Sequence, residues 1–133
     1  MLFTKASEYA LFALIYLADH KEAVGVEKIS SELALSKSFL AKVLQNLAKE
    51  EIVISYKGAN GGFILAKEPS NLSLKEILSA AENSQSRVFD CTVNECYQNQ
   101  SCKIWYMFSA LQKHIDNFLE DITLEDILKG EKF

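Results

Sequence analysis

The sequence has few of the residues that interrupt regular structure. Its 133 residues include one proline and five glycines, and no stretch is repeated or of low complexity. Flexible linkers and disordered tails need such residues in quantity, so we expect one compact domain with at most a small appended lobe. Hydrophobic residues make up 49% of the chain, which is enough to bury a core.

Long apolar runs are also lacking. The apolar run at residues 9–18 has ten residues, whereas a membrane-spanning helix needs about 20. Lys5 and Glu8 interrupt the approach to this run and no small-residue cleavage site follows it, so we expect no secretory signal. These absences predict a cytoplasmic protein with no membrane partner. Because residues 9–18 are apolar on every face, we expect them to belong to a central buried helix with Thr4 as its N-cap.

Positive charge is scarce and unevenly placed. The chain has 14 basic and 18 acidic residues, a net charge of −4. Residues 1–67 carry eight lysines and seven acidic residues, a net charge of about +1, whereas residues 68–133 carry six basic and eleven acidic residues, about −5. Only the first of these regions suits contact with phosphates.

Residues 26–47 have the pattern of two short helices joined by a tight turn. Val26, Ile29 and Leu33 recur at the spacing of one helix face, and Ser36 is placed to cap a second helix. The second helix has apolar residues on its inner side and outward residues Lys37, Ser38, Ala41, Lys42 and Gln45. This arrangement is typical of a helix-turn-helix, whose second helix enters the major groove of DNA, although any amphipathic helical hairpin shares the pattern.

A β-hairpin is predicted directly after this second helix. Residues 52–56 and 63–65 are rich in strand-forming side chains, and the glycine-rich residues 57–62 between them form a turn. The turn lacks the Gly-Lys-Ser/Thr ending of a phosphate-binding loop. The sequence therefore predicts a winged helix-turn-helix in residues 1–67. Besides Lys37, Ser38, Lys42 and Gln45, we expect DNA contacts from Thr4, Lys5, Lys57, Gly58 and Asn60.

The last part of the chain predicts a helix that pairs with a copy of itself. Ser73 and Glu76 form a capping box for a helix that runs to about residue 81. Apolar residues then recur in heptad alternation along a long C-terminal helix, with Trp105, Met107 and Leu119 beside them. The alternation lasts under three heptads, so packing within one chain is the alternative. We expect a homodimer interface formed by Ile104, Phe108, Leu111, Ile115 and Phe118, continued by Ile122.

The three cysteines, Cys91, Cys96 and Cys102, lie within one polar stretch of 12 residues. Thiolates are soft ligands for zinc, copper(I) or iron-sulfur clusters, and an odd number cannot all pair within one chain. Their gaps of four and five residues are wider than those of zinc ribbons or thioredoxin-like sites. The alternative, three buried structural thiols, suits a polar stretch poorly. Three thiolates leave a fourth ligand position, for which Asp90 and Glu95 are nearby oxygen donors.

The sequence does not predict an enzyme. Catalysis by a cysteine or serine nucleophile requires an adjacent base, and neither His20 nor His114 lies near such a residue in a recognisable motif. We therefore expect one domain with two regions: residues 1–67 for DNA binding, and residues 68–133 for sensing and dimerisation.

The chain resembles the Rrf2 family of bacterial winged-helix regulators, which has IscR-, NsrR- and RirA-like members. The resemblance lies in the order of four features: the start of the second helix at residues 36–40, the wing at residues 57–65, the three cysteines and a long final helix. The resemblance covers essentially the whole chain. It implies a mainly helical, dimeric transcriptional regulator that binds double-stranded operator DNA. It also implies a [2Fe-2S] or [4Fe-4S] cluster, held by the three cysteines, that senses nitric oxide, iron or cluster supply, or redox state.

This chain departs from parts of the family pattern. IscR-like members use a histidine as fourth ligand where this chain has Trp105, and NsrR-like members use an acidic residue from the other subunit where it has Glu8. The resemblance thus implies Glu8 of the partner subunit as fourth ligand. Ala41 and Lys42 replace the Glu and Gln of IscR, so we expect a different operator, and Lys57 replaces the wing arginine. The alternative is a winged-helix regulator without a cluster, which responds through thiol oxidation, zinc or a partner protein.

Overall fold

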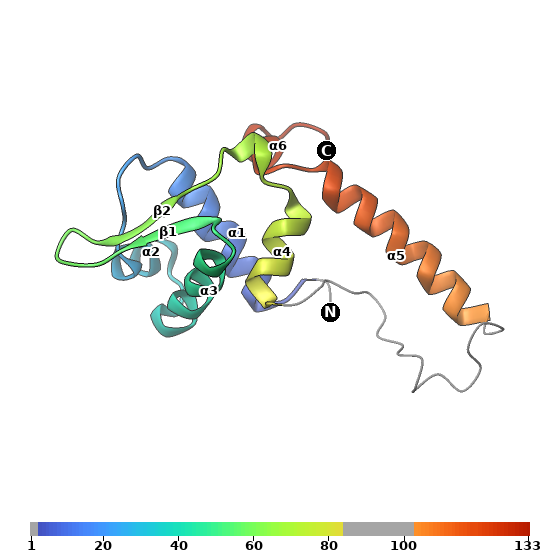
Figure 1. Ribbon diagram of the computed structural model, residues 1–133, viewed down its shortest axis with the longest axis horizontal. Helices are drawn as coiled ribbons and strands as arrows, with labels where there is room; N and C mark the ends of the chain where they lie inside the picture. Colours follow the sequence, from blue (N-terminus) through green and yellow to red (C-terminus); the bar gives the residue numbers. More distant parts are fainter. Residues whose placement is uncertain (1–2, 84–102) are drawn as a thin grey trace.

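The structure is a computed structural model that describes residues 3–83 and 103–133. Its elements are α1 (Lys5–Ala18), α2 (Val26–Leu33), α3 (Lys37–Lys49), β1 (Val53–Tyr56), β2 (Gly62–Leu65), the 3-10 helix η1 (Pro69–Asn71), α4 (Leu74–Glu82), α5 (Lys103–Asp121) and α6 (Leu124–Lys129). The first three helices and the β1–β2 hairpin form a compact group, which we call the head; α4 packs against the head and α5 leads away from it (Figure 1). This confirms the predicted fold, mainly helical with a two-stranded wing.

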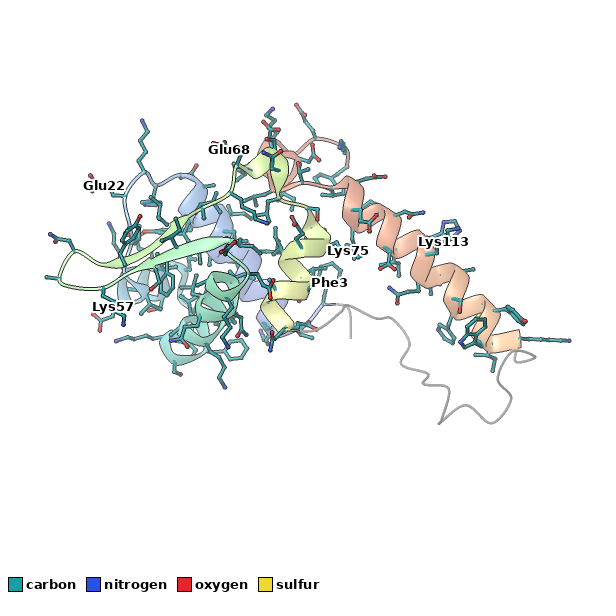
Figure 2. The ribbon with its side chains drawn as sticks, in the orientation of Figure 1. Phe3, Glu22, Lys57, Glu68, Lys75 and Lys113 are labelled. Carbon is teal, nitrogen blue, oxygen red and sulfur yellow. The ribbon has the colours of Figure 1, made fainter. Side chains whose placement is uncertain are left out.

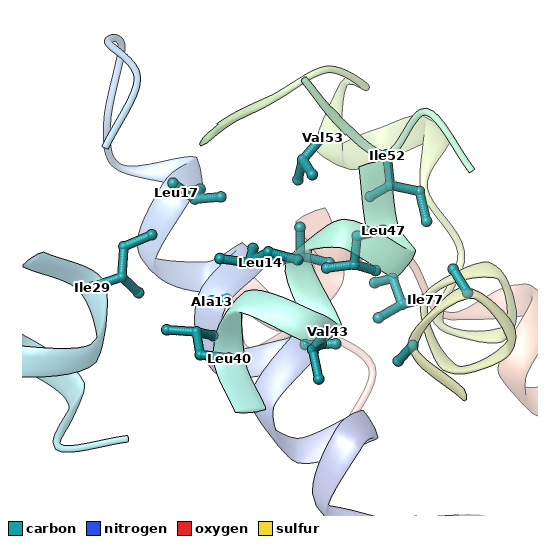
Figure 3. Close-up of a cluster of buried hydrophobic side chains, with 14 of the residues drawn as sticks. Ala13, Leu14, Leu17, Ile29, Leu40, Val43, Leu47, Ile52, Val53 and Ile77 are labelled. Carbon is teal, nitrogen blue, oxygen red and sulfur yellow. The ribbon is translucent and has the colours of Figure 1, made fainter. Parts of the chain in front are cut away.

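Helix α1 is the centre of the head because one side of it packs against every other part of the core. Ala10, Ala13, Leu14 and Leu17 are at most 1% exposed and belong to a cluster with side chains from α3, β1 and α4 (Figure 3). Burial of a leucine side chain contributes about 1.5–3 kcal/mol. The expectation that this run is buried on every side is wrong in the single chain, because Phe12 is 45% exposed.

The predicted helix-turn-helix forms with its turn at Ala34. Ala34 has a φ of 54°, the left-handed conformation that ends α2, and α3 begins two residues after Leu35. Ser36 occupies the N-cap position as predicted, but its hydroxyl makes no capping hydrogen bond; it lies 3.4 Å from the Ser38 hydroxyl instead. Apolar residues of both helices pack inward, so the outer face of α3 is left to polar side chains.

The wing is an antiparallel hairpin in which Val53 pairs with Leu65 and Tyr56 with Gly62. A further pairing comes from outside the hairpin, since Val24 and Phe63 exchange backbone hydrogen bonds of 2.9 and 2.8 Å. Gly62 has a φ of +145°, and a Cβ atom there would meet the Val24 backbone at 2.3 Å. Only glycine permits this approach, so Gly62 fixes the wing against the segment between α1 and α2.

The N-termini of α4 and α6 each have a capping box, and a short backbone bridge joins them. The Ser73 hydroxyl accepts the Glu76 backbone N–H at 3.2 Å and the Glu76 carboxylate accepts the Ser73 N–H at 3.2 Å, as predicted. Thr123 and Asp126 repeat this arrangement at α6. Ser73 and Thr123 also form an isolated antiparallel bridge. The C-terminal end of α5, immediately before Thr123, is thereby held against the start of α4.

Helix α5 contacts the rest of the chain mainly through its C-terminal end. Leu119 and Ile122 are 1% and 3% exposed and form a second small core with Leu74 and Leu78 of α4. Ile122, predicted to continue the dimer seam, is thus buried within its own chain, beyond the end of α5. Of the described residues, no helix combines the length and apolarity needed to cross a membrane.

Candidate nucleic-acid interface and sensing site

The outer face of α3 carries the residues predicted to read DNA. Lys37, Ser38, Lys42 and Gln45 are all exposed, and their spacing places them on one side of the helix. The inner face of the same helix is held by Leu40, Val43, Leu44 and Leu47, which are at most 2% exposed. A polar outer face on a firmly packed helix can enter a groove without losing core contacts.

Lys37 is not free in this structure, because its ammonium group pairs with the carboxylate of Glu27 on α2. The hydrogen bond from Lys37 lowers the pKa of the Glu27 carboxyl below its usual value. Both side chains are more than half exposed, so the pair is weak and can exchange for a DNA phosphate. Sequence reasoning did not find this pair, since it joins two helices whose relative placement is tertiary.

The wing tip presents Lys57, Gly58 and Asn60, all exposed. Gly58 has a φ of +106°, and its carbonyl accepts the Gly61 N–H at 3.0 Å, which closes the turn. Figure 2 shows Lys57 at the far end of the hairpin, well away from Phe3 beside the end of α4. The structure therefore does not bring Thr4 and Lys5 into one patch with the wing tip.

The start of α1 is instead occupied by interactions within the chain. Thr4 accepts the Ser7 N–H at 3.4 Å and donates from its hydroxyl to Glu82 on α4. The Ser7 hydroxyl, which is fully buried, donates to the same Glu82 oxygen at 3.0 Å. Lys5 pairs with Glu8 at 3.5 Å. Glu82 was expected to begin the irregular segment, but it is the last residue of α4.

Glu8 lies in the first turn of α1 with its side chain 51% exposed. Its ion pair to the 77% exposed Lys5 is weak and readily broken. A carboxylate in this position is open to a ligand from outside the chain, as the expected role of Glu8 requires. Cys91, Cys96 and Cys102 lie outside the described residues, as do the alternative donors Asp90 and Glu95. Among residues 3–83 and 103–133, no three His, Cys, Asp or Glu side chains gather into a metal site.

The donor set of the chain is compatible with an iron-sulfur cluster. Three thiolates and one carboxylate would supply four ligands, and thiolates are the usual ligands of such clusters. Glu8 is accessible and lies on the first helix of the head, while the thiols follow α4 in the sequence.

Tyr9 connects the start of α1 to the reading helix α3. Its hydroxyl accepts the backbone N–H of Ser36 at 3.0 Å. Its ring packs edge-on against Phe39, with the ring centroids 4.9 Å apart and the planes at 84°. Tyr9 thus holds both the N-cap and the first turn of α3, a role that its place in an apolar run did not indicate.

The residues predicted to form a dimer lie along α5. Ile104, Leu111 and Phe118 are 57%, 42% and 54% exposed, and Phe108 and Ile115 are half-buried. Trp105 and Met107 add 38% and 58% exposed apolar side chains near the helix start. Single chains rarely expose this much apolar surface along one helix.

Known proteins resemble this chain in sequence over most of its length. The family Rrf2, described as "Iron-dependent Transcriptional regulator", matches residues 3–130. The regulator NsrR of Oceanobacillus iheyensis is 30% identical over 132 residues, which cover 96% of this chain and 90% of NsrR.

Solved structures extend the likeness to three dimensions. IscR of T. potens is 28% identical with a TM-score of 0.74, and the match covers 99% of this chain and 89% of IscR. CymR, the global cysteine regulator of B. subtilis, has a TM-score of 0.75 over 99% of both chains. At 23% identity, the CymR likeness shows a shared fold alone.

Proposed function

The chain belongs to the Rrf2 family of DNA-binding transcriptional regulators, and from that premise we propose that it is a homodimer whose operator binding is controlled by an iron-sulfur cluster. The observation that carries this proposal is the match of residues 3–130 to a family described as iron-dependent, in a chain with three thiols within 12 residues. The regulator acts on DNA and is not an enzyme. Its place of action is the bacterial cytoplasm.

Residues 1–67 contact the operator through two surfaces. The outer face of α3 enters the major groove, where Lys42 and Gln45 contact base edges and Ser38 contacts a phosphate. Lys37 exchanges Glu27 for a DNA phosphate in the same step. The wing places Lys57 and Asn60 on the adjacent backbone or in the minor groove. Thr4 and Lys5 remain secondary contacts, since the start of α1 lies far from the wing tip (Figure 2).

Residues 68–133 supply the dimer interface and the sensor. The apolar face of α5 pairs with the same face of a second copy, which covers Leu111, Phe108 and Ile115. Cys91, Cys96 and Cys102 hold the cluster, and Glu8 of the second copy supplies the fourth ligand. When bound, the cluster supplies an iron centre that nitric oxide, oxygen or iron limitation can damage. The bond from Glu8 to the cluster joins the sensing segment of one subunit to the head of the other.

Anaerobic purification tests the cluster directly. A cluster gives brown protein with absorbance in the visible range, and Cys91→Ala, Cys96→Ala and Cys102→Ala each abolish that absorbance. The operator is obtained by selection from random duplexes, and binding is then compared between the cluster-bound and cluster-free forms. Colourless protein after anaerobic reconstitution, with unaltered DNA binding, contradicts the cluster and leaves a regulator that acts through its thiols, zinc or a partner protein.

A further inference from the structure

The last turn of α4 is tied by hydrogen bonds to two helices of the head. The Glu82 carboxylate accepts the hydroxyls of Thr4 and Ser7 on the α1 side, and the Ala81 carbonyl accepts the Asn46 side-chain amide of α3 at 3.3 Å. Figure 1 shows the end of α4 beside the start of α1 and against α3. No other turn of α4 has side-chain hydrogen bonds to both helices among the described residues.

The Glu82 contacts are of a strong kind. A carboxylate that accepts from hydroxyl groups forms charge-assisted hydrogen bonds, which exceed neutral ones in strength. Ser7 is fully buried, and without Glu82 its hydroxyl would keep only the longer contact of 3.5 Å to the Thr4 hydroxyl. Ala81 beside it is 1% exposed and packs in the main core. A shift of this turn is therefore opposed by contacts that the head cannot easily replace.

The contacts of the start of α1 lead on to the reading helix. Tyr9 lies two residues after Ser7, accepts the Ser36 N–H at 3.0 Å and packs on Phe39. Movement of α1 at Ser7 thus moves the N-cap and first turn of α3. Asn46 provides a second, direct link from Ala81 to the C-terminal part of α3. The end of α4 is thus connected to α3 by two routes, one through α1 and Tyr9 and one through Asn46.

The same turn is the covalent start of the cysteine segment. Asn83 ends α4 with a φ of 55°, and Cys91 follows Glu82 by nine residues in the sequence. We propose that the last turn of α4, Ala80–Glu82, is the coupling element by which the sensing segment controls the reading helix, with Glu82 as its positioning residue. This inference rests on the proposed function and assigns the route by which the sensor acts within one subunit.

The variant Glu82→Ala tests the coupling. The measured quantity is the ratio of operator dissociation constants between the cluster-free and cluster-bound forms, which an effective switch changes by about fivefold or more. Glu82→Ala is expected to retain the cluster absorbance but to bring this ratio within about twofold of one. Glu82→Gln keeps a side-chain oxygen that accepts both hydroxyls, so it restores most of the ratio. A parent-like ratio in Glu82→Ala overturns the inference.

Glu76→Ala is the matched control at the opposite end of the same helix. It also removes a carboxylate and weakens α4, through loss of the capping box, but the polar contacts of Glu76 go to Ser73 and Lys67 and not to α1 or α3. It is expected to lower the melting temperature and leave the ratio unchanged. If Glu82→Ala fails to fold, Ser7→Ala, which removes one buried donor, takes its place. An equal loss of the ratio in the Glu76 control would show general destabilisation and also overturn the inference.

Hydrogen exchange on the cluster-free protein separates this inference from the proposed function. In Glu82→Ala, exchange is expected to rise about tenfold at Ser7 and Glu8, whose N–H groups donate to Thr4, and also at Ser36, whose N–H is held by Tyr9. Faster exchange at Ser7 and Glu8 alone, or no change, overturns the link to α3. If the parent binds no cluster or shows a ratio of one, the proposed function fails, and exchange at Ser36 still decides whether this turn positions the reading helix.

Discussion

Lys57 is the residue whose contribution to DNA binding is simplest to isolate. It is exposed at the wing tip, and no ion pair holds it among the described residues. A lysine that neutralises one phosphate releases about one counterion, so Lys57→Ala should reduce the slope of log affinity against log salt by about one. Binding should weaken on operator and unrelated duplexes alike, as measured by a salt titration of fluorescence anisotropy.

Lys113→Ala provides the control for this titration. Lys113 is exposed on α5, far from the wing in Figure 2, and its removal changes the net charge by the same amount. Its salt slope should equal that of the parent. Equal slopes for the parent and Lys57→Ala would show that the wing does not contact DNA phosphates.

Glu8 is the residue that decides the identity of the fourth ligand. A carboxylate is a hard ligand on a soft iron-sulfur centre, so its bond should be the weakest of the four and the first place where nitric oxide reacts. Glu8→Ala should retain a cluster with altered absorbance and circular dichroism, and with changed nitric-oxide reactivity. The exposed Glu22, between α1 and α2, gives the control Glu22→Ala. If the Glu8→Ala spectrum is identical to that of the parent, Glu8 is not a ligand, and the fourth ligand is Asp90, Glu95 or a bound small molecule.

At the scale of elements, α5 exposes several large apolar side chains along one helix. Leu111 is central on this face and 42% exposed in the single chain. Each leucine covered by a partner contributes about 1.5–3 kcal/mol, and an aspartate there would place a charge in an apolar interface. Leu111→Asp should therefore yield monomers or insoluble protein by sedimentation or light scattering. Lys113→Asp, two residues along the same helix, should stay dimeric, and a Leu111→Asp dimer of unchanged dissociation constant would place the interface elsewhere.

Helix α6 is stabilised by a carboxylate with a pH-dependent contribution. The Thr123 N–H donates to Asp126 at 2.9 Å and Lys132 pairs with it at 3.0 Å, and these contacts lower the pKa of Asp126, the backbone hydrogen bond most of all. A group whose pKa is lowered on folding contributes stability above its unfolded pKa, and this contribution disappears as the pH falls through the folded value.

Asp126→Asn should reveal this dependence in thermal melts. At pH 7 the variant should melt a few degrees below the parent, because the amide loses the Lys132 ion pair and accepts less strongly from Thr123. The difference should shrink as the pH falls below about 4, where the parent carboxylate becomes protonated. A difference that stays constant down to pH 2 would assign the effect to packing and not to ionisation.

At the scale of the whole molecule, the proposed dimer would join two heads through α5, and these heads would then have to fit the helical repeat of DNA. A two-fold dimer with one reading helix per subunit should select a near-palindromic operator whose half-sites lie about 34 Å apart. Insertion of half a helical turn between the half-sites should weaken binding strongly, since one reading helix would then face the wrong side of the duplex. Insensitivity to this insertion, in competition assays, would indicate that the heads bind independently.

The local elements of this chain could be predicted from the sequence because their signals are local. The capping box at Ser73 and Glu76, the tight turn between α2 and α3, and the glycine-rich wing each depend on residues within a few positions of one another. The apolar periodicity of α3 likewise fixes which residues face the groove and which the core. The heptad alternation of apolar residues, also a local signal, predicted the apolar face of α5.

The tertiary structure alone decided which of these elements touch, because the deciding partners lie far apart in the sequence. Glu82 meets Thr4 across 78 residues, Asn46 meets Ala81 across 35, and Val24 adds a rung to a hairpin that begins at Val53. The sequence around Glu82 gives no sign of its role, because its hydrogen-bond donors Thr4 and Ser7 come from a distant part of the chain. The sequence determined a reading helix, a wing and three thiols, and the packing of α1 against α3 and α4 determined how the start of one helix could act on another.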